Sequence, residues 1–169
     1  STPLYSSAAS DVYKRQMQQY RIKFILGKIT AYVDALRLGK TTVDDLTSYT
    51  QTAVEIEHIM PQTCADKELY GMNDEDFSVY INRLGNLTLL ENSINKSIHN
   101  DVYANKSKAY KQSKFYLTSS LSELVNQGHD TAINRTNSLL FAWSDWNKRS
   151  IEERQEMLYR LSEMIWEMS

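Results

Sequence analysis

Residues that interrupt regular structure are scarce in this sequence, with five glycines and two prolines among 169 residues. Glycine and proline are the strongest breakers of helices, so their scarcity favours a helical chain. Hydrophobic residues make up 41% of the sequence and charged residues 24%, which is the balance of an ordinary globular protein. The length suits one domain. We therefore expect a single, mostly helical domain.

The sequence also restricts the compartment and the kinds of metal site. Its one cysteine, Cys64, excludes an internal disulfide and a four-cysteine zinc site. No stretch approaches the roughly 18 apolar residues of a transmembrane helix. The first residues lack the charged head and apolar core of a secretory signal. We therefore expect a cytoplasmic protein that makes no contact with a membrane.

The first strong pattern predicts a helix from Met17 to Leu38. Apolar residues recur there every three or four positions, and Gly39 follows as a natural C-terminal stop. Residues 1–16 are small, polar and aperiodic, so we expect a disordered or non-native tail, unless its surroundings extend the helix into it. The domain itself is then expected to span residues 17–169.

Two short strands are expected among the helices. Residues 53–60 alternate apolar and polar side chains, and residues 86–90 form a second short run. Between them, Asn73 and the acids after it predict a helix N-terminus, with Gly85 closing that helix. The later elements are expected as a helix near Ser93, a long helix at about 100–125, a polar turn at 126–137, and a last helix Ile151–Glu167 with Ser150 and Glu153 as its cap. This order predicts an α+β fold.

Four polar residues in the strand region are candidates for chemistry. Glu57 and His58 offer a metal ligand and a base, but a regular strand would point them to opposite faces. Both can serve one site only if the strand ends there, and Pro61 favours a bend soon after. Asn86 on the second strand can hold a neighbouring imidazole or loop. Asn95, on the helix that follows, offers an amide oxygen suited to Mg²⁺.

The wider frame resembles a known nuclease family. The segments EHIMPQ, LGNLTLL, INKS and KSKAYKQS, followed by a final W…IEER…L helix, occur in this order. They resemble the C-terminal HNH domain of GmrSD-type, modification-dependent restriction endonucleases, over residues 17–169. HNH nucleases are also called His-Me finger or ββα-metal nucleases. The resemblance implies a ββα-metal core built on a two-stranded antiparallel hairpin.

The resemblance also implies roles for individual residues. His58 becomes the general base that deprotonates water, and Asn86 orients His58 or fixes the metal-binding loop. Glu57 and Asn95 become the ligands of one divalent metal ion, with Mg²⁺ favoured and Mn²⁺ as the alternative. HNH sites often end with a histidine ligand where this chain has Asn95. His99, four residues on, is a second ligand, a phosphate contact or a surface residue, and as a ligand it widens the choice to Ni²⁺ or Zn²⁺.

Charge is distributed unevenly along the chain, although the formal net charge is only −2. Residues 55–76 carry seven acids against one lysine, so most of them must lie away from DNA. Residues 93–115 carry five lysines against one aspartate, with tyrosines between them. This segment is either a solvated helix face or a phosphate-binding face for double-stranded DNA. Its candidate contacts are Lys96, Lys106, Lys108, Lys111 and Lys114.

The functional hypothesis is a metal-dependent DNA endonuclease domain, the cutting module of a restriction system in a bacterial or archaeal cytoplasm. A catalytically decayed binding module and an HNH-like RNase are the alternatives. GmrSD-type proteins usually carry a ParB-like nucleotide-hydrolysing domain, so the resemblance implies one in the full-length protein. This chain itself shows no phosphate-binding glycine loop. Three of the candidate residues also have a purely structural interpretation: His58 as a structural histidine, Asn86 as a turn cap and Asn95 as a helix cap.

Overall fold

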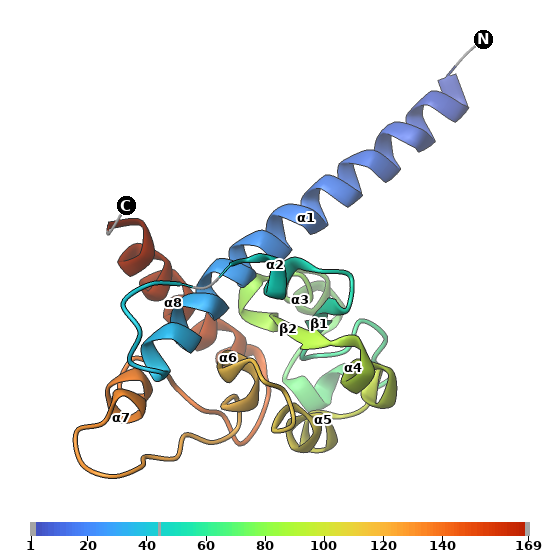
Figure 1. The fold of residues 1–169 in the computed structure, drawn as a ribbon. Coiled ribbons are helices and arrows are strands. Elements are labelled where there is room, and N and C mark those ends of the chain that lie inside the picture. Colours follow the sequence, from blue (N-terminus) through green and yellow to red (C-terminus); the bar gives the residue numbers. More distant parts are fainter. Residues whose placement is uncertain (1–2, 44, 168–169) are drawn as a thin grey trace.

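The computed structural model describes residues 3–43 and 45–167. It shows one long helix crossing a small hairpin, with shorter helices grouped around the hairpin (Figure 1). Its elements in chain order are α1 (Pro3–Arg37), α2 (Thr47–Thr50), β1 (Val54–His58), η1 (Lys67–Tyr70), α3 (Asp74–Tyr80), η2 (Leu84–Asn86), β2 (Leu87–Glu91), α4 (Asn92–Ile98), α5 (Tyr103–Tyr110), α6 (Tyr116–Ser119), α7 (Ala132–Asn137) and α8 (Lys148–Glu167). This arrangement confirms the predicted fold class, mostly helical with a two-stranded antiparallel hairpin.

Helix α1 is longer than its apolar pattern indicated, because it begins at Pro3 and not near Met17. The segment expected as a tail is therefore helical, although residues 1 and 2 of it lie outside the described residues. Side chains 7–20 are all exposed, and this half of α1 projects away from the rest of the molecule (Figure 1). The helix stops as predicted, with Gly39 at a φ of 68°. Neither α1 nor any other helix in the described ranges is long and apolar enough to cross a membrane.

The hairpin places the two predicted strands side by side. β1 and β2 pair in antiparallel register, with Glu57 opposite Thr88 and His58 opposite Leu87. One face of the hairpin packs on α1 through a cluster that includes Leu26, Val54, Leu87, Leu89 and Phe115. Leu90, on the other face, joins the larger core formed by residues of α1, α3, α5 and α8. The hairpin is thus held between two apolar clusters.

Helix α8 secures the start of β2. Arg154 is fully buried, and its Nη1 donates to the carbonyl oxygens of Gly85 and Leu87 at 3.0 and 2.6 Å. A Cβ on Gly85 would lie 2.2 Å from the carbonyl oxygen of Ile151, so only glycine permits this approach. Gly85 does not close α3, as we had expected, because that helix already ends at Tyr80. Its role is to let η2 contact α8.

Three other helix boundaries differ from expectation. The long helix expected at 100–125 is broken into α5 and α6. The break occurs where Glu91 accepts hydrogen bonds from the hydroxyl of Ser113 and the amide of Lys114, at 2.7 and 2.9 Å. The expected turn at 126–137 contains α7. α8 begins before Ser150, because Asn147 and Ser150 cap each other through their side chains.

Candidate active site

Strand β1 separates the two residues of the Glu-His pair. Consecutive side chains on a strand point to opposite faces. Glu57 points into the protein and is 4% exposed. His58 is the last residue of the strand, is partly exposed, and lines an open groove. Glu57 and His58 therefore lie in two different environments.

The groove beside His58 lies between α1 and the hairpin and has a volume of about 760 Å³. One wall is formed by α1 residues between positions 15 and 23, and the other by β1 and the segments around it. Its polar lining residues are Arg15, Gln16, Gln18, Gln19, Tyr20, Lys23, Thr52, Glu55, His58, Gln62 and Asn82. The groove is thus lined with cations, amides, one imidazole and one carboxylate, that of Glu55.

His58 is held by one side-chain partner in this groove. Its Nε2 lies 3.1 Å from Oδ1 of Asn82. Burial lowers the pKa of His58 below 6.5, and the nearby charge of Lys106 lowers it further, against the opposing effects of the Asn82 hydrogen bond and the charge of Glu57. The imidazole is therefore mainly uncharged at neutral pH. An uncharged imidazole can accept a proton.

Glu57 forms a buried ion pair. Its Oε1 accepts hydrogen bonds from Nζ of Lys106 at 2.6 Å and from the hydroxyl of Tyr110 at 2.8 Å. Lys106 also donates to the carbonyl oxygen of His58 at 2.8 Å. Burial and the charge of Glu57 raise the pKa of Tyr110 well above 10, so its hydroxyl remains a donor. Glu57 and Lys106 thus tie α5 to the end of β1.

This pair corrects two expectations from the sequence. Lys106 has an exposed fraction of 0%, so it cannot contact a phosphate of DNA. Glu57 was expected to share a metal with Asn95, but its carboxylate is already neutralised by Lys106. The structure does not bring Glu57 and Asn95 together, because Asn95 bonds to Glu55. The regular strand geometry that Pro61 was expected to relieve persists through His58.

Asn86 is fully buried and holds the segment that follows β1. Its Oδ1 accepts from the amide of Met60 at 2.8 Å and from Nε1 of Trp146 at 3.0 Å. Its Nδ2 donates to the carbonyl oxygens of Met60 and Ile81 at 3.1 and 2.9 Å. These four bonds place Asn86 behind the loop after His58 and not against the imidazole. Asn86 was predicted either to orient His58 or to fix the loop, and this geometry supports the second role.

Asn95 has an unusual hydrogen-bonding state. It is 7% exposed, and its Nδ2 donates to Oε2 of Glu55 at 2.7 Å. Its Oδ1 is buried without a hydrogen-bond partner. Buried acceptors of this kind are uncommon and call for an explanation. A free amide oxygen beside a carboxylate is a donor set that suits a hard cation such as Mg²⁺.

The fit for a metal ion therefore favours Asn95 with Glu55, and not Asn95 with Glu57. Glu55 is among the residues that line the groove beside His58. No group of three His, Cys, Asp or Glu residues within the described residues is arranged to hold a metal. Mg²⁺ commonly takes only one or two protein carboxylates and completes its shell with water and phosphate oxygens. Sequence reasoning missed Glu55, although it lies two residues before Glu57 and so on the same face of a regular strand.

The remaining predicted residues lie outside the groove. His99 is exposed just after α4, whereas Asn95 in the same helix is buried. Lys96 and Lys108 are exposed, and Lys111 pairs with Glu123 at 2.8 Å. Lys114 is also exposed, and it lines a different cavity. None of these residues is among those that line the His58 groove.

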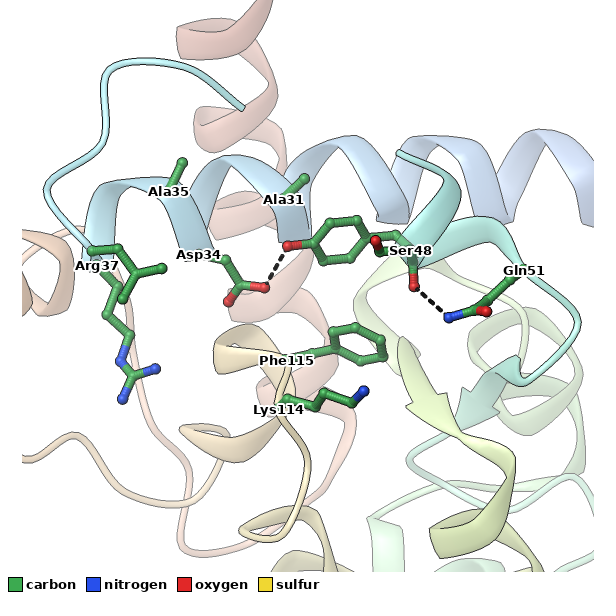
Figure 2. Close-up of a pocket in the computed structure, with 10 residues that line it drawn as sticks. Ala31, Asp34, Ala35, Arg37, Ser48, Gln51, Lys114 and Phe115 are labelled. Carbon is green, nitrogen blue, oxygen red and sulfur yellow. Dashed lines mark hydrogen bonds between the residues drawn. The ribbon is translucent and has the colours of Figure 1, made fainter. Parts of the chain in front are cut away.

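That second cavity, of about 340 Å³, lies toward the other end of α1 (Figure 2). Asp34 is its central polar group, and its carboxylate accepts from the hydroxyl of Tyr49 at 2.8 Å and from the amide of Tyr116 at 2.9 Å. Burial raises the pKa of Asp34. Figure 2 shows Lys114 and Phe115 on the opposite side of the cavity from α1. The hydrogen bonds of Asp34 join α1 to α2 and α6, which is a structural role.

The fold and the site together define a class: a mostly helical α+β domain with a histidine at the end of a hairpin strand, open to a polar groove. Residues 5–161 match the family model described as the C-terminal domain of GmrSD restriction endonucleases. The match covers most of the chain, so the chain belongs to this family. No curated protein and no solved structure matches it. The match begins at residue 5, within the segment that we had expected to be a tail.

Proposed function

We propose that this chain is a metal-dependent HNH endonuclease domain that hydrolyses phosphodiester bonds of double-stranded DNA. The observation that carries the proposal is the placement of His58, an imidazole with a lowered pKa in an open groove. Membership of a restriction endonuclease family supports the same reaction. In this proposal the chain is the cutting module of a GmrSD-like system, and a ParB-like domain of the full-length protein directs it to modified or foreign DNA.

His58 acts as the general base of this reaction. An amide oxygen can only accept a hydrogen bond, so with Oδ1 of Asn82 facing Nε2, the ring proton lies on Nε2. Nδ1 then holds the lone pair that takes a proton from the attacking water. The new P–O bond forms as the P–O3′ bond breaks, and the 3′ oxygen takes a proton from solvent. The products are a 5′-phosphate and a 3′-hydroxyl.

A divalent ion, Mg²⁺ ahead of Mn²⁺ or Ni²⁺, would be held by Asn95 and Glu55. The support is the unpartnered Oδ1 of Asn95 and the carboxylate beside it. Such an ion supplies Lewis-acid stabilisation of the charge that develops on the phosphoryl oxygens. Asn86 keeps the loop after His58 in place through its bonds to Met60.

A plasmid-nicking assay tests the proposal. Wild-type protein should nick supercoiled DNA with Mg²⁺ or Mn²⁺ and not with EDTA. His58→Ala should lower the rate by about 10²–10⁴-fold, the usual contribution of a general base. His129→Ala is the matched control, because His129 is exposed and is not among the residues that line the groove, and it should leave the rate unchanged.

Two outcomes would contradict the mechanism. Nicking that persists in His58→Ala would exclude His58 as the base. A folded wild-type protein that binds duplex DNA but never cuts it, in any of the three metals, would favour the decayed binding module. Duplex RNA of the same sequence, assayed in parallel, separates the DNase from the RNase.

A further inference from the structure

One wall of the His58 groove is made by α1 and is positively charged. Arg15 and Lys23 both line the groove, with the amides of Gln16, Gln18 and Gln19 in the same stretch. No acidic residue of α1 is among the lining residues. The acid among the lining residues is Glu55, which belongs to the opposite wall. This wall of the groove therefore carries cations and hydrogen-bond donors and no acid.

The two cations differ in how they are held. Lys23 donates to the carbonyl oxygen of Gln51 at 2.8 Å, and the charge of Glu55 lies within electrostatic reach of it. Lys23 is thus held in place by its hydrogen bond to Gln51. Arg15 is exposed, eight residues earlier on the part of α1 that projects beyond the hairpin (Figure 1). At a rise of about 1.5 Å per residue, the two lie roughly 12 Å apart along the helix, which is about three to four phosphate spacings of one DNA strand measured along the DNA axis.

We propose that Arg15 and Lys23 bind the phosphate backbone of the DNA strand that lies against His58. This inference rests on the proposed function and deepens it, because it names the residues that position the substrate. The wall has the chemistry that such a role requires: phosphate contacts come from arginine, lysine and amide side chains and read no sequence. Cleavage by the domain alone is therefore weakly sequence-specific.

The groove also replaces the lysine-rich segment 93–115 as the proposed DNA-binding surface. The exposed lysines of residues 93–115 do not line it, and Lys106 is buried. The cations of α1 do, although Arg15 lies in the segment set aside as a tail. DNA binding should therefore depend on α1 and not on Lys108 or Lys111.

The test is equilibrium binding of a fluorescent 20-base-pair duplex to the full chain in EDTA, measured by anisotropy over a range of salt concentrations. Arg15→Gln and Lys23→Gln should each weaken binding by on the order of three- to tenfold and reduce the salt-dependence slope by about 0.9. Arg21→Gln is the matched control. It makes the same change of charge on the same helix, at an exposed position outside the groove, and should change affinity less than twofold.

Activity provides the second readout. Arg15→Gln should raise KM with little change in kcat, because a backbone contact is made equally in the bound substrate and in the transition state. Arg15 is exposed on a free helix face, so its substitution should leave the melting temperature unchanged.

The inference and the proposed function fail in different ways. Equal losses of binding in Arg15→Gln and Arg21→Gln, or no loss in Arg15→Gln, would overturn the inference even if the enzyme cuts DNA. Wild-type protein that does not bind the duplex would also overturn it. Binding that depends on Arg15 and Lys23 without cleavage in any metal would leave the inference standing and remove the proposed function.

Discussion

Glu57 and His58 are neighbours in the chain but belong to two different regions of the molecule. Glu57 is enclosed with Lys106 and Tyr110 between the hairpin and α5. His58 opens into a groove beside α1. The comparison teaches that one short motif can divide its work, with an acid that braces the strand from inside and an imidazole that faces the groove. Lys106, the partner of Glu57, also donates a hydrogen bond to the carbonyl oxygen of His58, so the buried ion pair holds the backbone of the histidine as well.

The largest effect is expected when the buried ion pair of Glu57 and Lys106 is disrupted. Lys106→Met should lower the free energy of unfolding by about 3–5 kcal/mol, because the carboxylate of Glu57 is left buried without its cation. Chemical denaturation measures the loss. Lys108→Met, at an exposed position of the same helix, should change stability by less than about 0.5 kcal/mol.

A double variant sharpens that result. Glu57→Gln combined with Lys106→Met removes both charges, so it should recover part of the stability lost in Lys106→Met alone. Equal stability of Lys106→Met and Lys108→Met would mean that the buried ion pair does not brace the strand.

Asn86→Ala is expected to have the next largest effect. It leaves four buried groups on Met60, Ile81 and Trp146 without their partner. At about 1–3 kcal/mol for each unsatisfied group, with water or relaxation compensating for some, the loss should be roughly 2–4 kcal/mol in thermal or chemical unfolding. Asn82→Ala, an asparagine exposed on the groove side, should cost far less. Similar losses in both would contradict the division between a braced interior and an open groove.

The groove side of this comparison can be tested through the pH dependence of stability and of cleavage. Burial lowers the pKa of His58 below 6.5, so the folded state binds fewer protons on it than the unfolded state in the interval between the two values. The contribution of uncharged His58 to the free energy of unfolding is therefore present above the interval between the folded and unfolded pKa values, and is lost as pH falls through that interval. Cleavage should rise with pH through the lowered pKa and level off by neutrality. A rising limb above pH 6.5 would mean that another group is the base.

The smallest expected effect is a change in the titration of His58 itself. Its hydrogen bond with Asn82 raises the pKa, so Asn82→Ala should lower that value further while stability changes little. NMR titration of the ring protons of His58 follows this change. An unchanged pKa of His58 would show that the recorded contact with Asn82 is not formed in solution.

Expectations based on local chemistry were confirmed. The scarcity of breakers predicted a mostly helical fold, alternation predicted the first strand and a short run at residues 86–90 the second, and Gly39 ends α1 as expected. Asn73 caps α3 by accepting from the amide of Asp76 at 2.8 Å. Each of these features depends on residues that are close in the chain.

Expectations based on contacts between distant segments were less successful. Lysine 106 belongs to a basic run in sequence, and only the approach of β1 to α5 makes it the partner of Glu57. Gly85 resembles a helix stop, but it serves the contact of η2 with α8. Arg15 lies in an aperiodic polar segment, and only the course of α1 past the hairpin brings it to the groove.

The sequence by itself determined both strands, most of the helices and the presence of an imidazole at the end of β1, because hydrophobic patterns and capping act over a few residues. The pairing of the strands into a hairpin was implied by the family resemblance. The tertiary structure alone decided which of two adjacent polar residues is buried. It also decided which carboxylate lies beside Asn95 and which cations line the groove. Those outcomes depend on burial and on partners supplied from elsewhere in the chain: a charged group stays inside only where an opposite charge meets it, as Lys106 meets Glu57.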